Sequence, residues 1–452
     1  MTGLPLIIVF VLAIIVMIVA ISKFKIHPFL SIMGVSLILA LVAGIPLGDI
    51  ANVIGAGFSG TFSSIGIVII LGALIGSILE QTGAAFKLAD MVIKVVGKKN
   101  PELAMELMGW VVSIPVFCDS GFVILDPIRK ALVRRTGTSS VAMTVALSAG
   151  LYIAHVFIPP TPGPIAAANT LGIGNNLLLV MGMGALASIF PLIAGLIFAK
   201  YIGKKVKSSD ETVSSDEVVK TYEELVAEYG KLPGGFNSLA PLIVPIVFMA
   251  LGTVKSMAGL TGAFADLLTF LGTPIIALTV GTIFAIAQLA TAKKMDKFYD
   301  LVNDTLKTVG PILFVTAAGG VLGKVISNTS MIAYITENAP ALMSMGIFFP
   351  FLLAAILKTA QGSSTVAITT TAGIVAPLMA ELGLATPVLA SLTVMAIGAG
   401  AMTVSHANDS YFWVVTNFGK MTPKQGYKTQ TILTLVMGIA SIIGIWLVSL
   451  IF

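Results

Sequence analysis

The stretch that most constrains the fold is residues 110–169, which are almost wholly apolar yet contain polar groups and backbone breaks. It begins with WVVSIPVFCDSGFVILDP, interrupted at residues 118–121, and continues into SAGLYIAHVFIPPTPGPIAAANTLG, which holds four prolines and a histidine. Proline removes a backbone donor and clashes with the preceding helical turn. A carbonyl freed inside a bilayer needs another partner or a water-filled cavity. Neither part can therefore be one plain spanning helix, and both indicate a binding site.

Composition places these breaks in a membrane. The chain is 57% hydrophobic and 10% charged, against roughly 25% charged residues in a soluble domain. Residues 136–199 contain no Asp, Glu, Lys or Arg, and about 20 apolar residues suffice for one crossing. We therefore predict an all-α polytopic membrane protein without a soluble catalytic domain. Residues 1–22 lack the basic region and cleavage site of a signal peptide, so we expect a retained helix.

The order of elements predicts two related halves, residues 1–201 and 238–452, joined by a polar linker at residues 202–237. Each half is expected to contain five crossings, one of them broken, and one re-entrant hairpin whose arms are too short to cross. The direct similarity between the halves is weak, so the prediction depends on this order. The hairpins are expected at residues 102–135 and 342–378, and the broken crossings at residues 139–170 and 386–418.

Charge gives the expected orientation. Five crossings per half is an odd number, so the halves insert with opposite orientation. Of the 26 Lys and Arg residues, 23 fall in segments on the same side as the linker, which the positive-inside rule makes cytoplasmic. Both termini are then external. This use of basic residues also explains the net charge of +5 without a nucleic-acid partner. Inverted repeats with discontinuous helices are the architecture of secondary transporters.

Ionisable residues inside the membrane are costly and indicate function. Asp119 lies at the expected first hairpin tip and Asp409 in the second broken crossing, so both could face one central cavity and carry protons. The plainer interpretation of Asp119 is a helix cap, because Asp satisfies free N–H groups at helix starts. Asp126 is expected to cap a helix or to pair with Arg129.

Two histidines, His155 and His406, occupy corresponding places in the two halves. Histidine titrates near neutral pH and suits a proton relay, although a histidine in apolar sequence is often only a hydrogen-bonded core residue. Lys358 could balance a substrate carboxylate or pair with an acid, and the sequence leaves both open. One cysteine excludes an internal disulfide and a Cys-based metal site, and no His/Cys cluster has ligand spacing. We therefore expect no metal and no cofactor.

Polar residues at the breaks predict a substrate site. Half-helix N-termini favour an anion, and hydroxyls and amides suit a polyhydroxylated ligand. The alternative for the small residues is close helix packing. The candidate substrate-binding residues are Ser120, Gly121, Thr161, Pro162, Gly163, Gln361, Gly362, Ser363, Ser364, Thr365, Ser405 and Asn408.

Three segments, CDSGFVILDPI, HVFIPPTPGPIAAANTLG and SHANDSYFWVVTNFG, resemble the signature segments of the gluconate permease (GntP) family, over essentially the whole chain. The resemblance implies a symporter of the bacterial cytoplasmic (inner) membrane that imports gluconate or a related hydroxy acid with H⁺. It also implies kinship with the ion transporter superfamily, whose members are often homodimers. Other substrates in the family include aldonates, ketogluconates, D-serine and small hydroxy acids.

Three alternatives to a proton-coupled carrier stay open at this stage. A sodium-coupled carrier is the nearest, because backbone carbonyls at hairpin tips can ligate Na⁺. A channel predicts flux that never exceeds electrochemical equilibrium. An intramembrane enzyme is disfavoured, because the sequence has no HExxH or GxSxG motif.

Overall fold

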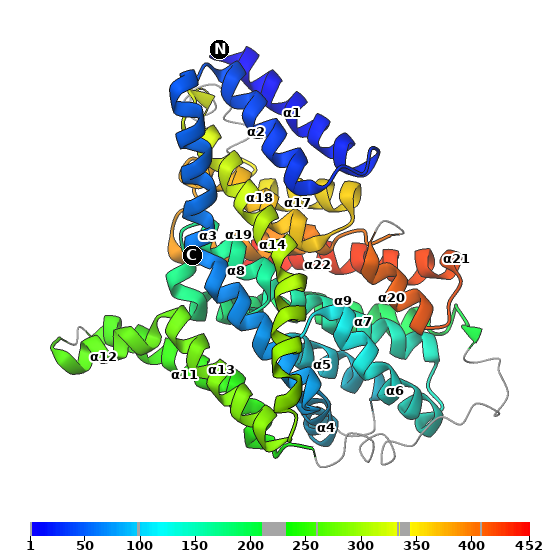
Figure 1. Cartoon of the computed structure of the whole chain (residues 1–452). Coiled ribbons are helices and arrows are strands. Elements are labelled where there is room, and N and C mark those ends of the chain that lie inside the picture. The colour runs from blue at the N-terminus through cyan, green and yellow to red at the C-terminus, as the bar shows by residue number, and fades with distance from the viewer. Residues whose placement is uncertain are drawn as a thin grey trace.

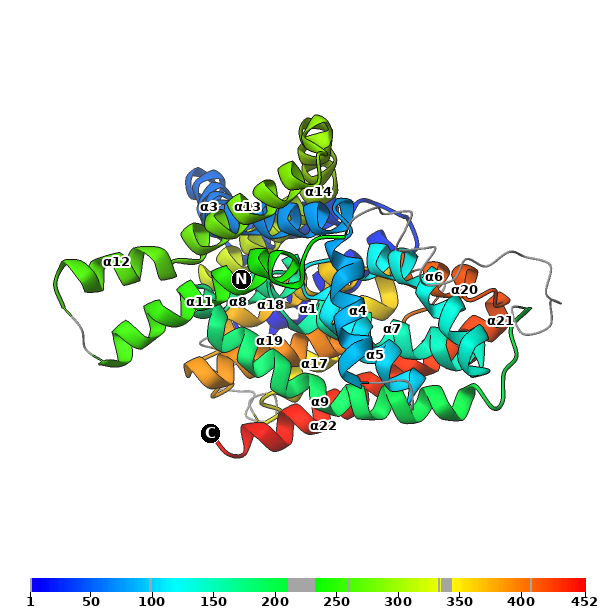
Figure 2. The same cartoon turned by 90° about the horizontal axis from the view of Figure 1, so that it is seen from below.

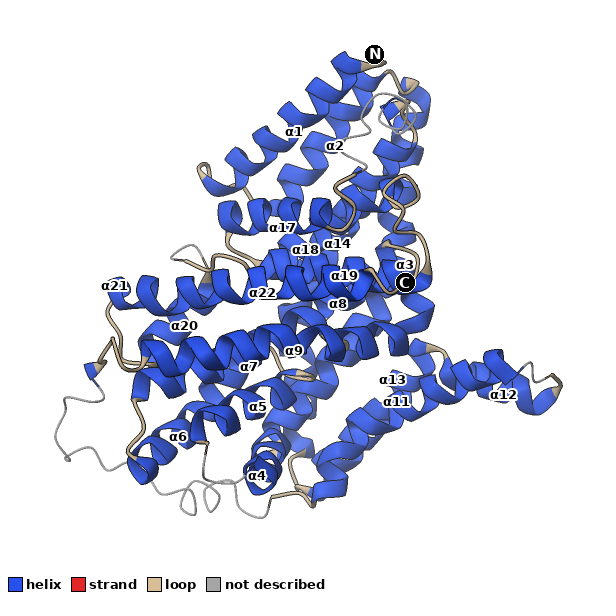
Figure 3. Ribbon diagram, turned by 180° about the vertical axis from the view of Figure 1, so that it is seen from behind, coloured by secondary structure: helices blue, strands red, loops and turns tan. Residues whose placement is uncertain are grey.

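The computed structural model describes residues 2–96, 100–209, 232–258, 261–331, 334, 344–406 and 409–452. All regular elements within them are helices (Figures 1 and 3), which confirms the all-α prediction for that part of the chain. Most of the linker, residues 210–231, lies outside the described residues.

The helices before the linker are α1 (Leu4–Ser22), α2 (Pro28–Ala43), α3 (Leu47–Gln81), α4 (Ala84–Val96), α5 (Pro101–Ser113), α6 (Cys118–Thr136), α7 (Ser140–Phe157), α8 (Pro162–Thr170), η1 (Gly174–Asn176) and α9 (Leu177–Ile202). The helices after it are α11 (Gly235–Ala258), α12 (Ala263–Gly272), α13 (Pro274–Thr291), η3 (Met295–Lys297), α14 (Phe298–Ser327), α17 (Phe348–Gln361), α18 (Ser364–Val375), η4 (Ala376–Leu378), α19 (Pro387–Met402), α20 (Ser410–Phe418), α21 (Pro423–Gly426), η5 (Tyr427–Thr431) and α22 (Ile432–Ser449).

Seven helical segments of the described chain are long and apolar enough to cross a membrane, and α3 with α4, bent by 78°, makes an eighth. This confirms a polytopic membrane protein. Ten crossings were predicted. The other two expected segments correspond to α2 and α19, which are apolar but have only 16 residues each.

Local chemistry explains where the broken helices stop and start. Pro162 occupies the first turn of α8, where its missing N–H would have no helical partner in any case. Gly362 has φ 92°, a left-handed conformation that ends α17 at low cost. The side chains of Ser363 and Asp409 accept hydrogen bonds from backbone N–H groups at the starts of α18 and α20. The breaks lie at residues 114–117, 158–161 and 362–363, and between the end of α19 at Met402 and the start of α20 at Ser410.

The centre of the molecule is built on α7 and α19. Every residue of α7 is buried, and α5 packs along it, as α17 packs along α19. Next to this pair, α9 and α22 lie side by side (Figure 2), and α3 packs along α14. These neighbours are the ones that two related halves would have, and the inverted repeat itself stays a prediction.

Two groups of helices extend outward from this centre: α1 with α2, and α11 with α12 and α13 (Figure 1). Their outer faces expose large apolar side chains, among them Leu12, Val16, Phe264 and Phe270. An apolar surface this extensive is unfavourable in water, so these faces suit lipid.

Candidate functional site

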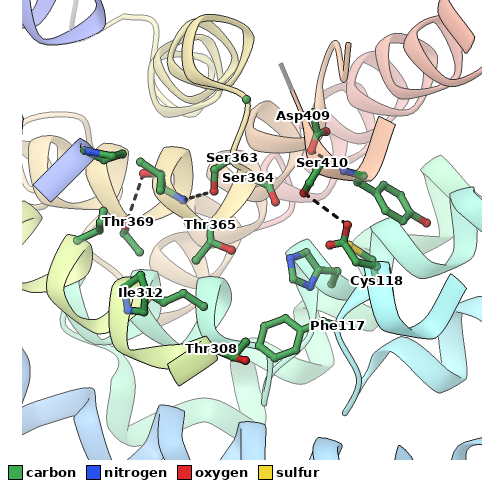
Figure 4. A pocket seen from close by; sticks show the side chains of 18 of the residues that line it. Phe117, Cys118, Thr308, Ile312, Ser363, Ser364, Thr365, Thr369, Asp409 and Ser410 are labelled. Atoms are coloured by element: carbon green, nitrogen blue, oxygen red, sulfur yellow. Dashed lines mark hydrogen bonds between the residues drawn. The ribbon is translucent and has the colours of Figure 1, made fainter. Parts of the chain in front are cut away.

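The broken helices surround one cavity of about 520 Å³ (Figure 4), a size typical of small-ligand sites. Residues from the starts of α2, α6, α18 and α20, together with faces of α7 and α14, line it. Its walls therefore come from both halves of the chain. The segment from α5 to α7 and the segment from α17 to α20 are far apart in sequence and meet here.

Four helices thus begin at this cavity. Their N-cap residues are His27 for α2, Phe117 for α6, Ser363 for α18 and Asp409 for α20, and all four line it. The first N–H groups of a helix have no partner within the helix, and the helix dipole makes this end positive. These helix ends therefore direct positive partial charge toward the cavity, and no lysine or arginine lines it among the described residues.

A buried ion pair closes one side of the cavity. Lys358 Nζ lies 2.6 Å from Asp409 Oδ2 and also donates to the carbonyl of Gly362. The hydroxyl of Ser405 donates to the same carboxylate oxygen, and Tyr411 N donates to Oδ1 at 3.1 Å. Asp409 thus has a cation and two further hydrogen-bond donors around its carboxylate.

Asp119 has a different environment. The hydroxyl of Ser410 donates to its Oδ1 at 3.4 Å, and the thiol of Cys118 lies 3.7 Å from Oδ2 (Figure 4). Within the described part of the chain it forms no ion pair. It is a cavity-lining carboxyl with two long contacts and no compensating cation.

Aromatic side chains line the cavity beside Asp409. The rings of Tyr152 and Tyr411 have centroids 5.0 Å apart, and the Tyr152 hydroxyl lies 3.5 Å from Asp409 Oδ2. His155 stacks against Tyr152 at 6.5 Å and has a buried Nδ1 without a hydrogen-bond partner. A neutral imidazole with a free nitrogen can take part in proton exchange.

The cavity brings together half of the residues that the sequence suggested. The predicted residues that line it are Asp119, Ser120, His155, Gly362, Ser363, Ser364, Thr365 and Asp409. Six others lie outside the lining, and their packing explains why.

Gly121 packs against Leu151, where an added Cβ would be 2.6 Å from Cδ2, and Gly163 packs in the same way against Ile368. Thr161, whose hydroxyl donates to a carbonyl 2.6 Å away, and Pro162 are buried at the start of α8. Ser405 is buried behind the carboxylate that it contacts.

The remaining three predicted residues are His406, which lies outside the cavity lining, and Gln361 and Asn408, whose side chains are not described. His406 contacts the carbonyl of Thr359 through Nε2 at 2.9 Å rather than the cavity. Asn408 lies outside the described residues, and Gln361 ends α17 with a side chain that is not described. The functional role of each predicted residue stays a prediction.

Sequence reasoning missed Cys118, Tyr152, Ser410 and Tyr411, and left the partner of Lys358 open. A signal for Tyr152 existed, because it precedes His155 by three residues and so lies on the same helix face. The expected pair of Asp126 and Arg129 is confirmed, with Nε 2.7 Å from Oδ1. Among the described residues no three His, Cys, Asp or Glu side chains are placed to hold a metal ion.

Comparison with known proteins gives a consistent result. A family described as GntP family permease matches residues 4–451. The chain is 34% identical to an uncharacterized permease of Haemophilus influenzae over 92% of this chain and 86% of that protein. It is 30% identical to a gluconate permease of Pseudomonas aeruginosa, covering 96% and 95%, and 31% identical to a low-affinity gluconate transporter of Escherichia coli, covering 98% of each.

A solved structure shares the fold. The crystal structure of the Alcanivorax borkumensis YdaH transporter, described as having an unusual topology, matches with a TM-score of 0.65. The match covers 94% of this chain and 97% of that one, at 15% sequence identity.

Proposed function

The chain belongs to the GntP family of permeases, and from that premise we propose that it imports gluconate or a related small hydroxy-acid anion by proton symport. It is a multi-pass membrane protein of a bacterial family, and its proposed location is the cytoplasmic (inner) membrane. Its relatives named for gluconate are about 30% identical over nearly their whole length. That identity supports the substrate class better than it supports any one substrate.

The observation that carries the proposal is the cavity where four helices begin. Its helix N-termini suit a carboxylate, and the hydroxyls of Ser363, Ser364 and Thr365 suit the hydroxyl groups of a sugar acid. A volume of about 520 Å³ accommodates a small organic acid with water.

For the proton we propose Asp119, with His155 as the relay. An anion that enters beside an ionised Asp119 is repelled at short range, and no cation compensates there. A proton on Asp119 removes that repulsion and supplies a donor, so proton and anion bind together. Asp409 is a weaker candidate, because its carboxylate already forms an ion pair with Lys358 at 2.6 Å. His406 is a weaker candidate, because it contacts a backbone carbonyl outside the cavity.

Coupling to a proton offsets the electrical cost of importing an anion. Moving one negative charge into a cell against an inside-negative potential costs roughly 2.3 kcal/mol per 100 mV. One proton carried with the anion cancels that charge and leaves the pH gradient as the driving force. Two protons would make uptake electrogenic.

The proposed mechanism is alternating access by two inverted repeats, residues 1–201 and 238–452. The hairpins α5–α6 and α17–α18 and the broken pairs α7–α8 and α19–α20 would move as a unit past a scaffold formed by the other helices. A homodimer is the proposed assembly. Support comes from the breaks before α6, α18 and α20, whose N-cap residues line the cavity, and from the fold shared with a transporter.

The test is uptake of labelled gluconate by proteoliposomes in sodium-free buffer, with and without an inward proton gradient. Unlabelled D-serine, 2-ketogluconate and 3-hydroxybutyrate serve as competitors. We expect accumulation that needs the proton gradient and is blocked by unlabelled gluconate. Uptake that needs sodium would show that the coupling ion is Na⁺ rather than H⁺. Flux that never exceeds electrochemical equilibrium would indicate a channel. Competition by another acid but not by gluconate would reassign the substrate.

A further inference from the structure

A second cavity of about 400 Å³ lies further along α14 and α18, two of the helices that line the first. Residues of α14 line the first cavity at positions 308–315 and the second at positions 320–327. At 1.5 Å of rise per residue, the centres of these two stretches are about 18 Å apart. Along α18 the order is the same, because residues 362–369 face the first cavity and residue 373 faces the second. α14 and α18 therefore each line both cavities, at successive positions along the helix.

Lys324 is the ionisable residue in the lining of the second cavity. Its side chain is exposed, and it forms no ion pair with any described residue. Asn169, Thr170 and Ser327 lie in the same lining and add an amide and two hydroxyls. A solvated ammonium beside neutral hydrogen-bonding groups attracts a carboxylate and can also hold hydroxyl groups.

Between the two cavities, α14 and α18 pack closely and contain a buried polar group without a hydrogen-bond partner among the described residues. α14 and α18 touch through backbone, since a Cβ on Gly373 would be 2.4 Å from the carbonyl oxygen of Gly319. Thr370, between them, is buried and its hydroxyl has no hydrogen-bond partner. It lies on the helix face shared by Val366 of the first cavity and Gly373 of the second. A buried hydroxyl without a partner is rare and calls for an explanation.

We propose that the second cavity is a separate anion-binding site, in which the Lys324 ammonium holds the carboxylate of the incoming hydroxy acid before it reaches the first cavity. The Thr370 hydroxyl is the next polar contact on the way. This inference rests on the proposed function and adds a path by which the substrate reaches the first cavity. Because Lys324 lies at the α14 end expected on the external face, the site acts on external substrate.

The test compares the Michaelis constant for external gluconate in proteoliposomes that hold the protein in one orientation. Lys324→Gln removes the charge and Lys324→Arg keeps it. The matched control is Lys307→Gln on the same helix, since Lys307 is 76% exposed and lines neither cavity. We expect KM to rise about tenfold in Lys324→Gln, with the maximal rate kept and a weaker dependence of KM on salt. Lys324→Arg and Lys307→Gln should resemble the wild type.

A chemical variant covers the case in which Lys324→Gln does not fold. Lys324→Cys is reacted, after reconstitution, with aminoethyl methanethiosulfonate, which attaches a new ammonium group to the thiol. KM should return toward the wild-type value when the reagent is added to the external face, while wild-type protein treated in the same way serves as control.

The outcomes separate the two proposals. Wild-type uptake with an unchanged KM in Lys324→Gln, or no recovery on reattaching the ammonium, overturns the second site and leaves the proposed function intact. Failure of the wild type to take up any hydroxy acid overturns the proposed function and the second site together.

Discussion

Lys358 Nζ and Asp409 Oδ2 lie 2.6 Å apart, and both side chains are buried where α17 meets the start of α20. The pair joins α17 to the start of α20, 51 residues further along the chain. Because Asp409 is already paired with Lys358, the proposed role of Asp409 is to fix the start of α20 against α17 rather than to carry a proton.

The first prediction concerns this pair. Lys358→Met leaves a buried carboxylate without its cation, which should cost about 3–5 kcal/mol of stability. The double variant Lys358→Met with Asp409→Asn should recover much of the loss, because asparagine keeps the N-cap of α20 without a charge. Thermal unfolding in detergent measures both. A single variant as stable as the wild type would show that the pair contributes little.

The second prediction concerns proton coupling. Asp119→Asn imitates a permanently protonated carboxyl, so the anion still enters but the proton no longer travels with it. We expect loss of accumulation driven by a proton gradient, while exchange of labelled for unlabelled gluconate at equal pH continues. The control is Asp304→Asn, at an exposed carboxylate on α14. Wild-type accumulation by Asp119→Asn would remove Asp119 from the mechanism.

How far the sequence predicts this site depends on the range of each interaction. The α18 start was predictable, because a glycine followed by serines ends one helix and caps the next within four residues. The location of Asp119 at a helix start was predictable for the same local reason. In contrast, Ser405 and His406 lie outside the cavity lining and contact distant segments, because the Ser405 N–H donates to the Thr434 hydroxyl and His406 Nε2 contacts the Thr359 carbonyl. No local pattern encodes such contacts.

The pairing of Lys358 shows the same limit. An intramembrane lysine signals function or a partner, but the choice among the acids depends on which helices become neighbours. Neighbours are set by packing, as in the backbone contact of Gly319 with Gly373. The sequence therefore predicted the kind of chemical groups in the site better than it predicted which residues form it.

The third prediction concerns the helix contact between the two cavities. A Cβ on Gly373 would overlap the Gly319 carbonyl, so Gly373→Ala should push α18 away from α14, with a cost of about 1–3 kcal/mol and slower transport. Gly310→Ala on α14 is the matched control, since nothing lies within 4 Å of its added Cβ. It should be neutral or slightly stabilising. Equal effects at the two sites would contradict a specific contact.

The last prediction concerns Arg129, which is fully buried and connects three helices. Its guanidinium donates to Asp126 at 2.7 Å, to the Ser140 hydroxyl at 2.6 Å and to the carbonyl of Phe418 at 3.2 Å. Arg129→Met should therefore cost about 3–5 kcal/mol, because Asp126 stays buried and loses its closest cation.

Lysine cannot replace this arginine, because one ammonium cannot reach three acceptors in the fixed geometry of a guanidinium. Arg129→Lys should therefore recover only part of the lost stability. The matched control is Lys130→Met, because Lys130 binds the same Asp126 at 3.1 Å but its side chain is 28% exposed, so its removal should cost less than about 1 kcal/mol. Thermal unfolding in detergent ranks the three variants. If Lys130→Met proved as damaging as Arg129→Met, charge near Asp126 rather than the three-way connection would hold α6 in place.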